Sequence, residues 1–392
     1  MIKYTIAFPY FPEQEIEEIL NKIRNILEGK SPLSMGPYVK KFEDEFAKYI
    51  GSKYAIATNS CTSALEIALR SIGLKEGDEV VVPVETFIAT GSSVVREKGK
   101  IVFAEIEPNT FCLSLRDLKN KVSNKTKAVI VVHMAGLITP DIWEIKDFCK
   151  KRGIFLIEDA AHAHGAMIDG VKAGNIGDIG CFSFYPTKIM TSAEGGMITT
   201  NNEELYKKGK SFRNRGIDVN ANVEIYSEIG SNNRMSELHA LLGLSQLKHI
   251  EEFISHRNKI AKIYNSELEE MEKEGGVLSI IKNPSNIRHS YWRYIVKLSE
   301  KIDRNLLRQK MLKKGIAIDW PYDPPLHLQP VFKKLYGTKE GMMKRSEQAM
   351  KRHVCLPIHL KITEEDAMYI VSEFKKILKK NIKGKGRCIR SL

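Results

Sequence analysis

The feature that most constrains this chain of 392 residues is the alternation of short β-branched runs with helical stretches between residues 54 and 157. Five apolar runs, from Tyr54–Ala57 to Ile154–Ile157, are typical of strands, and segments such as Ala64–Ile72 have helical spacing. Strands separated by helices pair in parallel, because a parallel pair needs a crossover connection. The pattern predicts a doubly wound, mostly parallel α/β sheet that binds ligands beyond the carboxyl ends of its strands.

The pattern changes after about residue 250. A long charged helix is followed by a strand near Tyr291–Leu298, a further helix and a proline-rich stretch around Pro324 that suits neither a helix nor a central strand. We therefore predict a large domain over residues 1–250 and a smaller C-terminal α/β domain over residues 251–392. The proline-rich loop is expected to reach the binding site.

Charge and cysteine content narrow the class of protein. The net charge is +13, but the chain from Lys375 onward carries eight Lys or Arg and no acidic residue, which leaves +5 (13 − 8) for the rest. We interpret this basic tail as a solvated end, and nucleic-acid binding as unlikely on this basis.

No stretch approaches the roughly 20 apolar residues of a membrane span. The six cysteines show no disulfide or CxxC spacing, so we expect a cytoplasmic protein without a membrane partner.

Polar segments follow three of the predicted strands. In the first, Cys61 and Thr62 begin a helix, whose N-terminal N–H groups favour an anion such as a phosphate. A plain helix cap is the alternative explanation. In the second, Asp159 ends an apolar strand, where an ionised carboxylate is unfavourable unless a cation or several donors meet it. The protonated ring nitrogen of a cofactor would be such a cation.

The third segment runs from Ser183 to Lys188 and continues into a loop rich in glycine and serine. On position alone, a lysine in such a loop is more often a surface residue. His162 and His164 stand two residues apart, but no carboxylate or cysteine lies at a familiar zinc-site spacing, so we expect no metal site.

Several ordered motifs resemble the DegT/DnrJ/EryC1/StrS family of pyridoxal phosphate (PLP) dependent sugar aminotransferases, over nearly the whole chain. The matching segments are GPYVKKFEDEFAKYIG, SCTSAL, GDEVVVPVETFIAT, IEDAAHAHGA, GDIGCFSFYPTK, EGGMITT and GSNNRMSELHALLGLSQL. The resemblance implies fold type I architecture. It also implies that Lys188 forms the Schiff base with PLP and that Asp159 pairs with the pyridinium nitrogen, which keeps the ring able to accept electrons.

Further cofactor contacts follow from the same resemblance. Phe87 falls where the family stacks an aromatic ring on PLP, and His162 falls near the cofactor's phenolic oxygen. Ser183, Thr62 and the backbone at Cys61 match the ligands of the cofactor phosphate.

The resemblance also implies a homodimer with shared sites, because Asn232 matches an asparagine that reaches the phosphate from the neighbouring subunit. Arg215 replaces a common histidine. We expect substrate specificity to depend on Arg215, on Pro32–Gly36 and on the region around His327.

The resemblance favours amino transfer, with L-glutamate as the expected donor, to a 3-keto or 4-keto sugar carried on a nucleoside diphosphate. A PLP-dependent sugar dehydratase of the same family is one alternative, although those relatives replace the lysine by histidine. The other alternative is a regulatory or nucleic-acid-binding protein built on an inactive aminotransferase scaffold, which would have no physical need for Lys188 and Asp159.

Overall fold

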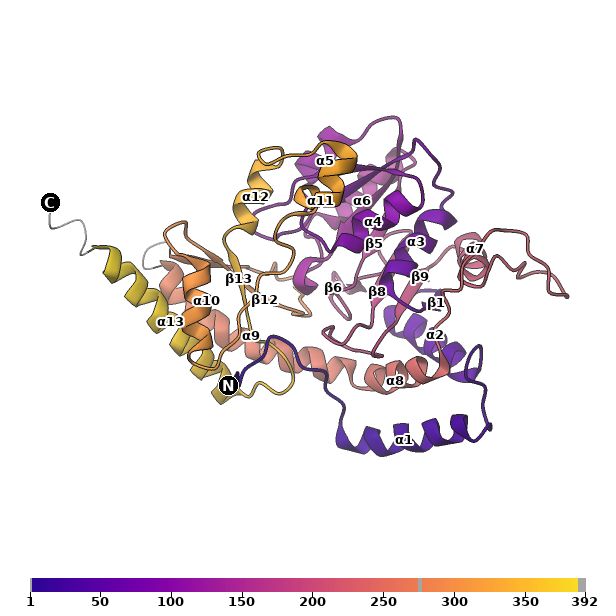
Figure 1. Cartoon of the computed structure of the whole chain (residues 1–392), viewed down its shortest axis with the longest axis horizontal. Helices are drawn as coiled ribbons and strands as arrows, with labels where there is room; N and C mark the ends of the chain where they lie inside the picture. The colour runs from indigo at the N-terminus through magenta and orange to yellow at the C-terminus, as the bar shows by residue number, and fades with distance from the viewer. Residues whose placement is uncertain (1, 274–276, 387–392) are drawn as a thin grey trace.

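A seven-stranded sheet forms the centre of the computed structural model, which describes residues 2–273 and 277–386 (Figure 1). Across the sheet the order is β1 (Tyr54–Thr58), β9 (Gly196–Thr200), β8 (Ile179–Ser183), β5 (Phe155–Asp159), β4 (Thr126–Val132), β2 (Glu79–Pro83) and β3 (Lys100–Ala104). β9 is antiparallel to both of its neighbours, and the other adjacent pairs are parallel. The predicted doubly wound, mostly parallel sheet is confirmed.

Helices cover both faces of this sheet because successive strand residues point to opposite sides. In β4, Val129 and Val131 join one hydrophobic cluster, whereas Ala128 and Ile130 join another. The first cluster includes side chains of α2 (Pro37–Ile50), α5 (Leu115–Lys121), α6 (Ile142–Lys151) and α8 (Glu237–Lys248). The second includes side chains of α3 (Cys61–Ser71), α4 (Ile88–Arg96) and α7 (Glu203–Arg213).

A third hydrophobic cluster lies mainly in the C-terminal part of the chain and also contains Tyr4. Its elements are α9 (Ile250–Lys273), β10 (Leu278–Ile280), β12 (Tyr294–Leu298), β13 (His353–Leu356), α10 (Arg304–Leu312) and α13 (Glu364–Gly386), and the three strands form an antiparallel sheet. The domain boundary near residue 250 stays a prediction.

Shorter elements connect these parts. A small sheet joins β11 (Ile287–Arg288), β6 (Met167–Ile168) and β7 (Val171–Lys172). The proline-rich stretch leads through η2 (Leu326–Leu328) into α11 (Pro330–Tyr336) and α12 (Lys344–Met350). Leu326 and Phe332 pack in the cluster that covers one face of the large sheet, so this segment returns to the large sheet.

One strand is shorter than its apolar run. The apolar run over residues 128–138 continues past the strand within it, because β4 ends at Val132 and η1 (Met134–Gly136) follows. Ala135 and Gly136 have positive φ values of 57° and 99°, a conformation that a strand cannot contain. Gly136 also packs against the backbone carbonyl of His162, where a Cβ atom would come within 2.9 Å.

Within the described residues, no helix is long and apolar enough to cross a membrane. The same residues contain no group of three His, Cys, Asp or Glu that could hold a metal ion. Residues 387–392, the end of the predicted basic tail with Cys388, lie outside the described residues.

The start of β9 fits closely against the start of α3. A Cβ atom on Gly196 would lie 2.5 Å from the carbonyl oxygen of Ser60 and 2.6 Å from the backbone nitrogen of Cys61. These are backbone atoms that cannot move away as a side-chain tip can. Glycine at this position therefore lets the start of β9 meet the first turn of α3.

We predict that Gly196→Ala lowers the free energy of unfolding by about 1–3 kcal/mol, because the added methyl group meets backbone. Gly209→Ala is the matched control: its Cβ would meet side chains and no backbone, with the terminal methyl of Ile56 nearest at 2.6 Å, and alanine favours helix α7. Urea unfolding followed by circular dichroism measures both variants. Equal stability losses in the two variants would contradict this account of Gly196.

Candidate active site

A cavity of about 450 Å³ lies beyond the carboxyl ends of the central strands, as the parallel sheet predicts. Seven of the eight predicted site residues line it: Cys61, Thr62, Phe87, Asp159, His162, Ser183 and Lys188. They come from the ends of β1, β2, β5 and β8 and the segments that follow, so the strand order brings distant parts of the chain together.

Asp159 is the last residue of β5 and is only 5% exposed. Its carboxylate accepts hydrogen bonds from Thr90 Oγ1 at 2.8 Å and from the backbone N–H of Ala161 at 3.2 Å. Thr86 Oγ1 lies 2.6 Å from Thr90 Oγ1 and donates to it, since the hydroxyl hydrogen of Thr90 points to Asp159. Burial raises the pKa of Asp159, although these donors oppose the change.

Lys188 follows β8 in a loop of residues 184–195, which we call the lysine loop. Burial lowers the pKa of Lys188 from its ordinary value to about 8, although the carboxylate of Asp159 opposes that change. The Nζ atom lies 4.5 Å from the centre of the Trp292 ring. The alternative that position alone favours, an ordinary surface lysine, does not hold, because Lys188 is partly buried and lines the cavity.

One end of the cavity suits an anion. Ser60 caps α3 by accepting the backbone N–H of Ser63 at 3.2 Å, which leaves Cys61 and Thr62 as the first residues of the helix. The first N–H groups of a helix have no partner within it and attract negative charge. Ser183, buried at the end of β8, lines the same cavity.

A stack of three rings forms another wall. The ring of His162 lies parallel to Trp292, with centroids 3.7 Å apart, and its Nε2 atom is 2.8 Å from the hydroxyl of Tyr322. Burial keeps the pKa of His162 well below its ordinary value, so the ring is neutral. Its Nδ1 atom is buried and has no hydrogen-bond partner among the described residues.

Phe87 stands at the mouth of the cavity. The residue is 54% exposed although it follows the buried strand β2 by only a few positions. Its ring centroid lies 6.2 Å from that of Tyr322. The ring is therefore available to a planar ligand in the cavity, and a purely structural core role does not account for its exposure.

Asn232 does not line the cavity and is exposed on the segment between α7 and α8. Arg215, on the same segment, pairs with Glu224 at 3.5 Å. His327 is fully buried and lies 3.1 Å from Glu347, whereas Pro321 and Tyr322, a few residues earlier, line the cavity. That substrate specificity depends on the region around His327 stays a prediction. Pro32–Gly36 also lies outside the cavity lining of this chain.

The sequence prediction missed Thr90, Trp292 and Tyr322. Thr90 lies within the ETFIAT motif, one helical turn after Thr86, and that spacing could have indicated it. Trp292 comes from the C-terminal part of the chain, and no local pattern connects it with the cavity. Tyr322 is not among the predicted site residues, although it lies in the proline-rich loop that is expected to reach the site. The expectation that the proline-rich loop reaches the site is confirmed, because Pro321 and Tyr322 line the cavity.

The residues fit PLP. The cavity offers an amine at Lys188, a carboxylate at Asp159, a helix N-terminus for a phosphate and an exposed ring at Phe87. The Nδ1 atom of buried His162 has no hydrogen-bond partner in the part of the chain that the structure describes, so a ring that carries a polar group would suit this cavity better than a purely apolar ring.

Comparison with known proteins agrees with this geometry. The DegT/DnrJ/EryC1/StrS aminotransferase family matches residues 13–375. The GDP-perosamine synthase of Escherichia coli O157:H7 is 33% identical, with 87% of this chain and 91% of the relative covered. The UDP-N-acetyl-3-dehydro-alpha-D-glucosamine 3-aminotransferase of Acidithiobacillus ferrooxidans is 30% identical, and the match covers 92% of this chain and 94% of the relative. Among solved structures, the PLP form of a putative sugar aminotransferase from Streptococcus pneumoniae superposes with a TM-score of 0.86 at 26% identity. The superposition covers 96% of this chain and 99% of that chain.

We predict that the Lys188 amine of the cofactor-free protein reacts with a midpoint near pH 8, because burial disfavours its charged form. Pulsed acetylation at a series of pH values, followed by peptide mass spectrometry, measures this reactivity. Nα-acetyl-lysine amide, with an ordinary pKa of about 10.4, is the reference compound.

Asp159→Asn should move the Lys188 midpoint below that of the wild type, because the carboxylate favours the protonated amine. A midpoint that rises in this variant would contradict the electrostatic link between the two residues.

Proposed function

Because the chain belongs to the DegT/DnrJ/EryC1/StrS aminotransferase family, we propose that it transfers an amino group to a keto sugar carried on a nucleoside diphosphate. The chain is an aminotransferase and its cofactor is PLP. The observation that carries the proposal is the placement of Lys188 and Asp159 in one cavity, next to a helix N-terminus suited to the cofactor phosphate.

When bound, PLP supplies an electron-accepting ring. We assign Asp159 to the ring nitrogen, where its carboxylate holds a proton on that atom. Cys61, Thr62 and Ser183 would hold the phosphate, Phe87 would stack on the ring, and His162 would lie near the phenolic oxygen.

Lys188 has two tasks in this proposal: it binds the cofactor, and once released it takes the proton from the Cα atom of the amino donor. Both tasks need a neutral amine. With a pKa of about 8, roughly one lysine in ten is neutral at pH 7, far more than at the ordinary pKa. Burial of the lysine loop thus makes Lys188 a usable base near neutral pH.

The substrate class rests on the relatives. The names of the two relatives specify a GDP-linked sugar in one case and a UDP-linked 3-dehydro sugar in the other. A third relative, from Saccharopolyspora spinosa, is named for a dTDP-linked 4-dehydro sugar, so we propose a 3-keto or 4-keto nucleotide sugar as acceptor. The family resemblance adds L-glutamate as the proposed donor.

We also propose a homodimer in which Asn232 reaches the phosphate site of the partner subunit. Two observations support this. Asn232 lies outside the cavity of its own chain, on a segment that projects from the body beside α7 (Figure 1). The same segment exposes Val223 to 68% and Ile229 to 87%, as expected for apolar residues that contact a partner.

We predict that the wild-type protein, incubated with PLP and reduced with borohydride, gains the cofactor's mass on the peptide that contains Lys188. Lys188→Ala should lose this attachment. With ¹⁵N-labelled L-glutamate and a panel of 3-keto and 4-keto nucleotide sugars, the wild type should release 2-oxoglutarate and pass ¹⁵N to one sugar, as mass spectrometry of both products would show.

The matched control is Lys334→Ala, which removes an exposed lysine of α11 that does not line the cavity and should therefore behave as wild type. Loss of water from the sugar without ¹⁵N transfer would favour the dehydratase alternative. Absence of PLP attachment to Lys188 in the wild type would overturn the proposal and favour the inactive scaffold.

A further inference from the structure

The lysine loop is held from outside at positions on either side of Lys188. The indole N–H of Trp292 donates to the carbonyl oxygen of Thr187 at 2.8 Å. Three residues after Lys188, the backbone N–H of Thr191 donates to Oε1 of Gln246 at 3.3 Å. Within the loop, Thr191 Oγ1 donates to the carbonyl oxygen of Phe184 at 2.8 Å. The position of the lysine backbone therefore depends on two side chains remote in sequence.

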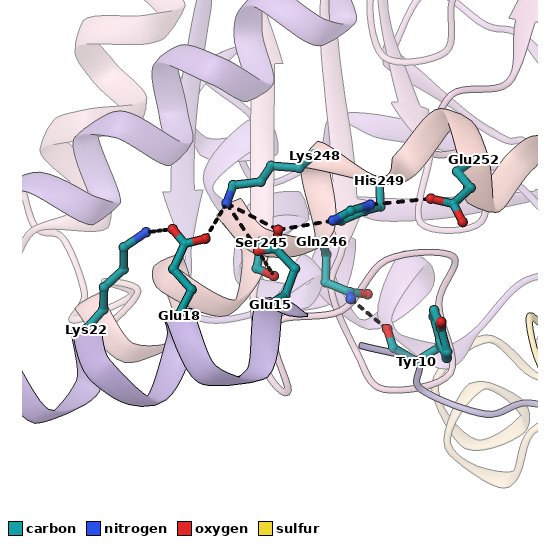
Figure 2. Close-up of polar contacts among 9 residues, drawn as sticks. All are labelled: Tyr10, Glu15, Glu18, Lys22, Ser245, Gln246, Lys248, His249 and Glu252. Atoms are coloured by element: carbon teal, nitrogen blue, oxygen red, sulfur yellow. Dashed lines mark hydrogen bonds and ion pairs between the residues drawn. The ribbon is translucent and has the colours of Figure 1, made fainter. Parts of the chain in front are cut away.

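Gln246 uses both ends of its amide. It lies on α8 and is 1% exposed, and while Oε1 accepts from Thr191, Nε2 donates to the carbonyl oxygen of Tyr10 at 2.7 Å. Figure 2 shows the bond to Tyr10. A buried amide that links two separate backbone segments fixes one relative to the other, because breaking either bond would leave a buried polar group unpaired.

The segment that contains Tyr10 is itself anchored. Near its start, the backbone N–H of Tyr4 donates to the carbonyl oxygen of Gly315 at 2.9 Å, and the N–H of Ala317 donates to that of Tyr4 at 2.8 Å. Beyond its end comes α1 (Glu13–Leu27), which lies beside α8 (Figure 1). The segment thus runs from the C-terminal part of the chain to α8.

A cluster of charged and polar residues holds α1 to the same part of α8. Glu15 is buried and accepts hydrogen bonds from Ser245 Oγ at 2.9 Å and Lys248 Nζ at 3.1 Å, and it lies 3.2 Å from His249 Nε2 (Figure 2). Ser245 and Gln246 are adjacent in sequence but face different neighbours: Ser245 faces α1, whereas Gln246 faces the lysine loop and Tyr10.

We propose that Gln246 is a positioning residue for Lys188, and that the segment before α1 supports the lysine loop through it. The inference deepens the proposed function, since it concerns the same lysine. If the role of Gln246 were purely structural, its loss would act like the loss of Ser245, which is similarly buried but whose side-chain hydroxyl donates to Glu15 on α1.

The test compares Gln246→Leu, which removes both hydrogen bonds at similar volume, with the matched control Ser245→Ala. The first readout is hydrogen exchange of the lysine-loop peptide in the cofactor-free protein, and the second is the rate of covalent PLP attachment to Lys188, trapped with borohydride. All proteins are assayed well below the lowest of their melting temperatures.

We expect faster exchange at Thr191 and attachment slowed by roughly 10- to 100-fold in Gln246→Leu, because a displaced lysine loses its alignment. Ser245→Ala should match the wild type in both readouts even where its melting temperature falls. Gln246→Glu, which keeps the acceptor for Thr191 but loses the donor to Tyr10, should also slow attachment if the N-terminal segment provides the support.

Unchanged loop exchange in Gln246→Leu, or equal slowing in Ser245→Ala, would overturn the inference while the wild type still attaches PLP. Lack of attachment in the wild type would instead contradict the proposed function and this inference together. If Gln246→Leu slows PLP attachment and Gln246→Glu does not, the hydrogen bond to Tyr10 is not needed. That result would contradict the part of the proposal in which the segment before α1 supports the lysine loop.

Discussion

The buried carboxyl group of Asp159 at the end of β5 is the constraint on which the rest of the site depends. An ionised carboxylate in an apolar interior is unfavourable unless donors or a cation meet it. Thr90 and the backbone of Ala161 supply two donors, and Thr86 orients Thr90. A cation would meet the rest of this charge, which makes a protonated ring nitrogen a suitable partner for Asp159.

Burial acts in opposite directions on the two principal titratable groups of the cavity. It raises the pKa of Asp159 and lowers that of Lys188, and each charged form partly offsets the effect of burial on the other. The stacked rings of His162 and Trp292 help to produce this low-dielectric wall, and Trp292 also binds the loop backbone. The contacts that pack the walls of the cavity therefore also set the pKa values of Asp159 and Lys188.

The sequence predicted what depends on local pattern. Strand and helix alternation predicted the sheet, and the resemblance of the motifs next to strand ends to those of the family predicted seven residues that line one cavity. It did not predict Trp292 or Gln246, since their contacts with the lysine loop are set by how the C-terminal part and α8 pack. Nor does a histidine in a proline-rich stretch indicate from sequence that Glu347 will bind it in the interior.

The antiparallel strand β9 has a consequence for synthesis of the protein. In the ladder, β1 pairs with β9, although β1 ends at Thr58 and β9 begins at Gly196. At a translation rate of about 5–20 residues per second, the ribosome needs on the order of ten seconds to make the chain between them. During that time β1 has an unpaired edge on the nascent chain, which is the situation in which strands associate wrongly and chaperones bind.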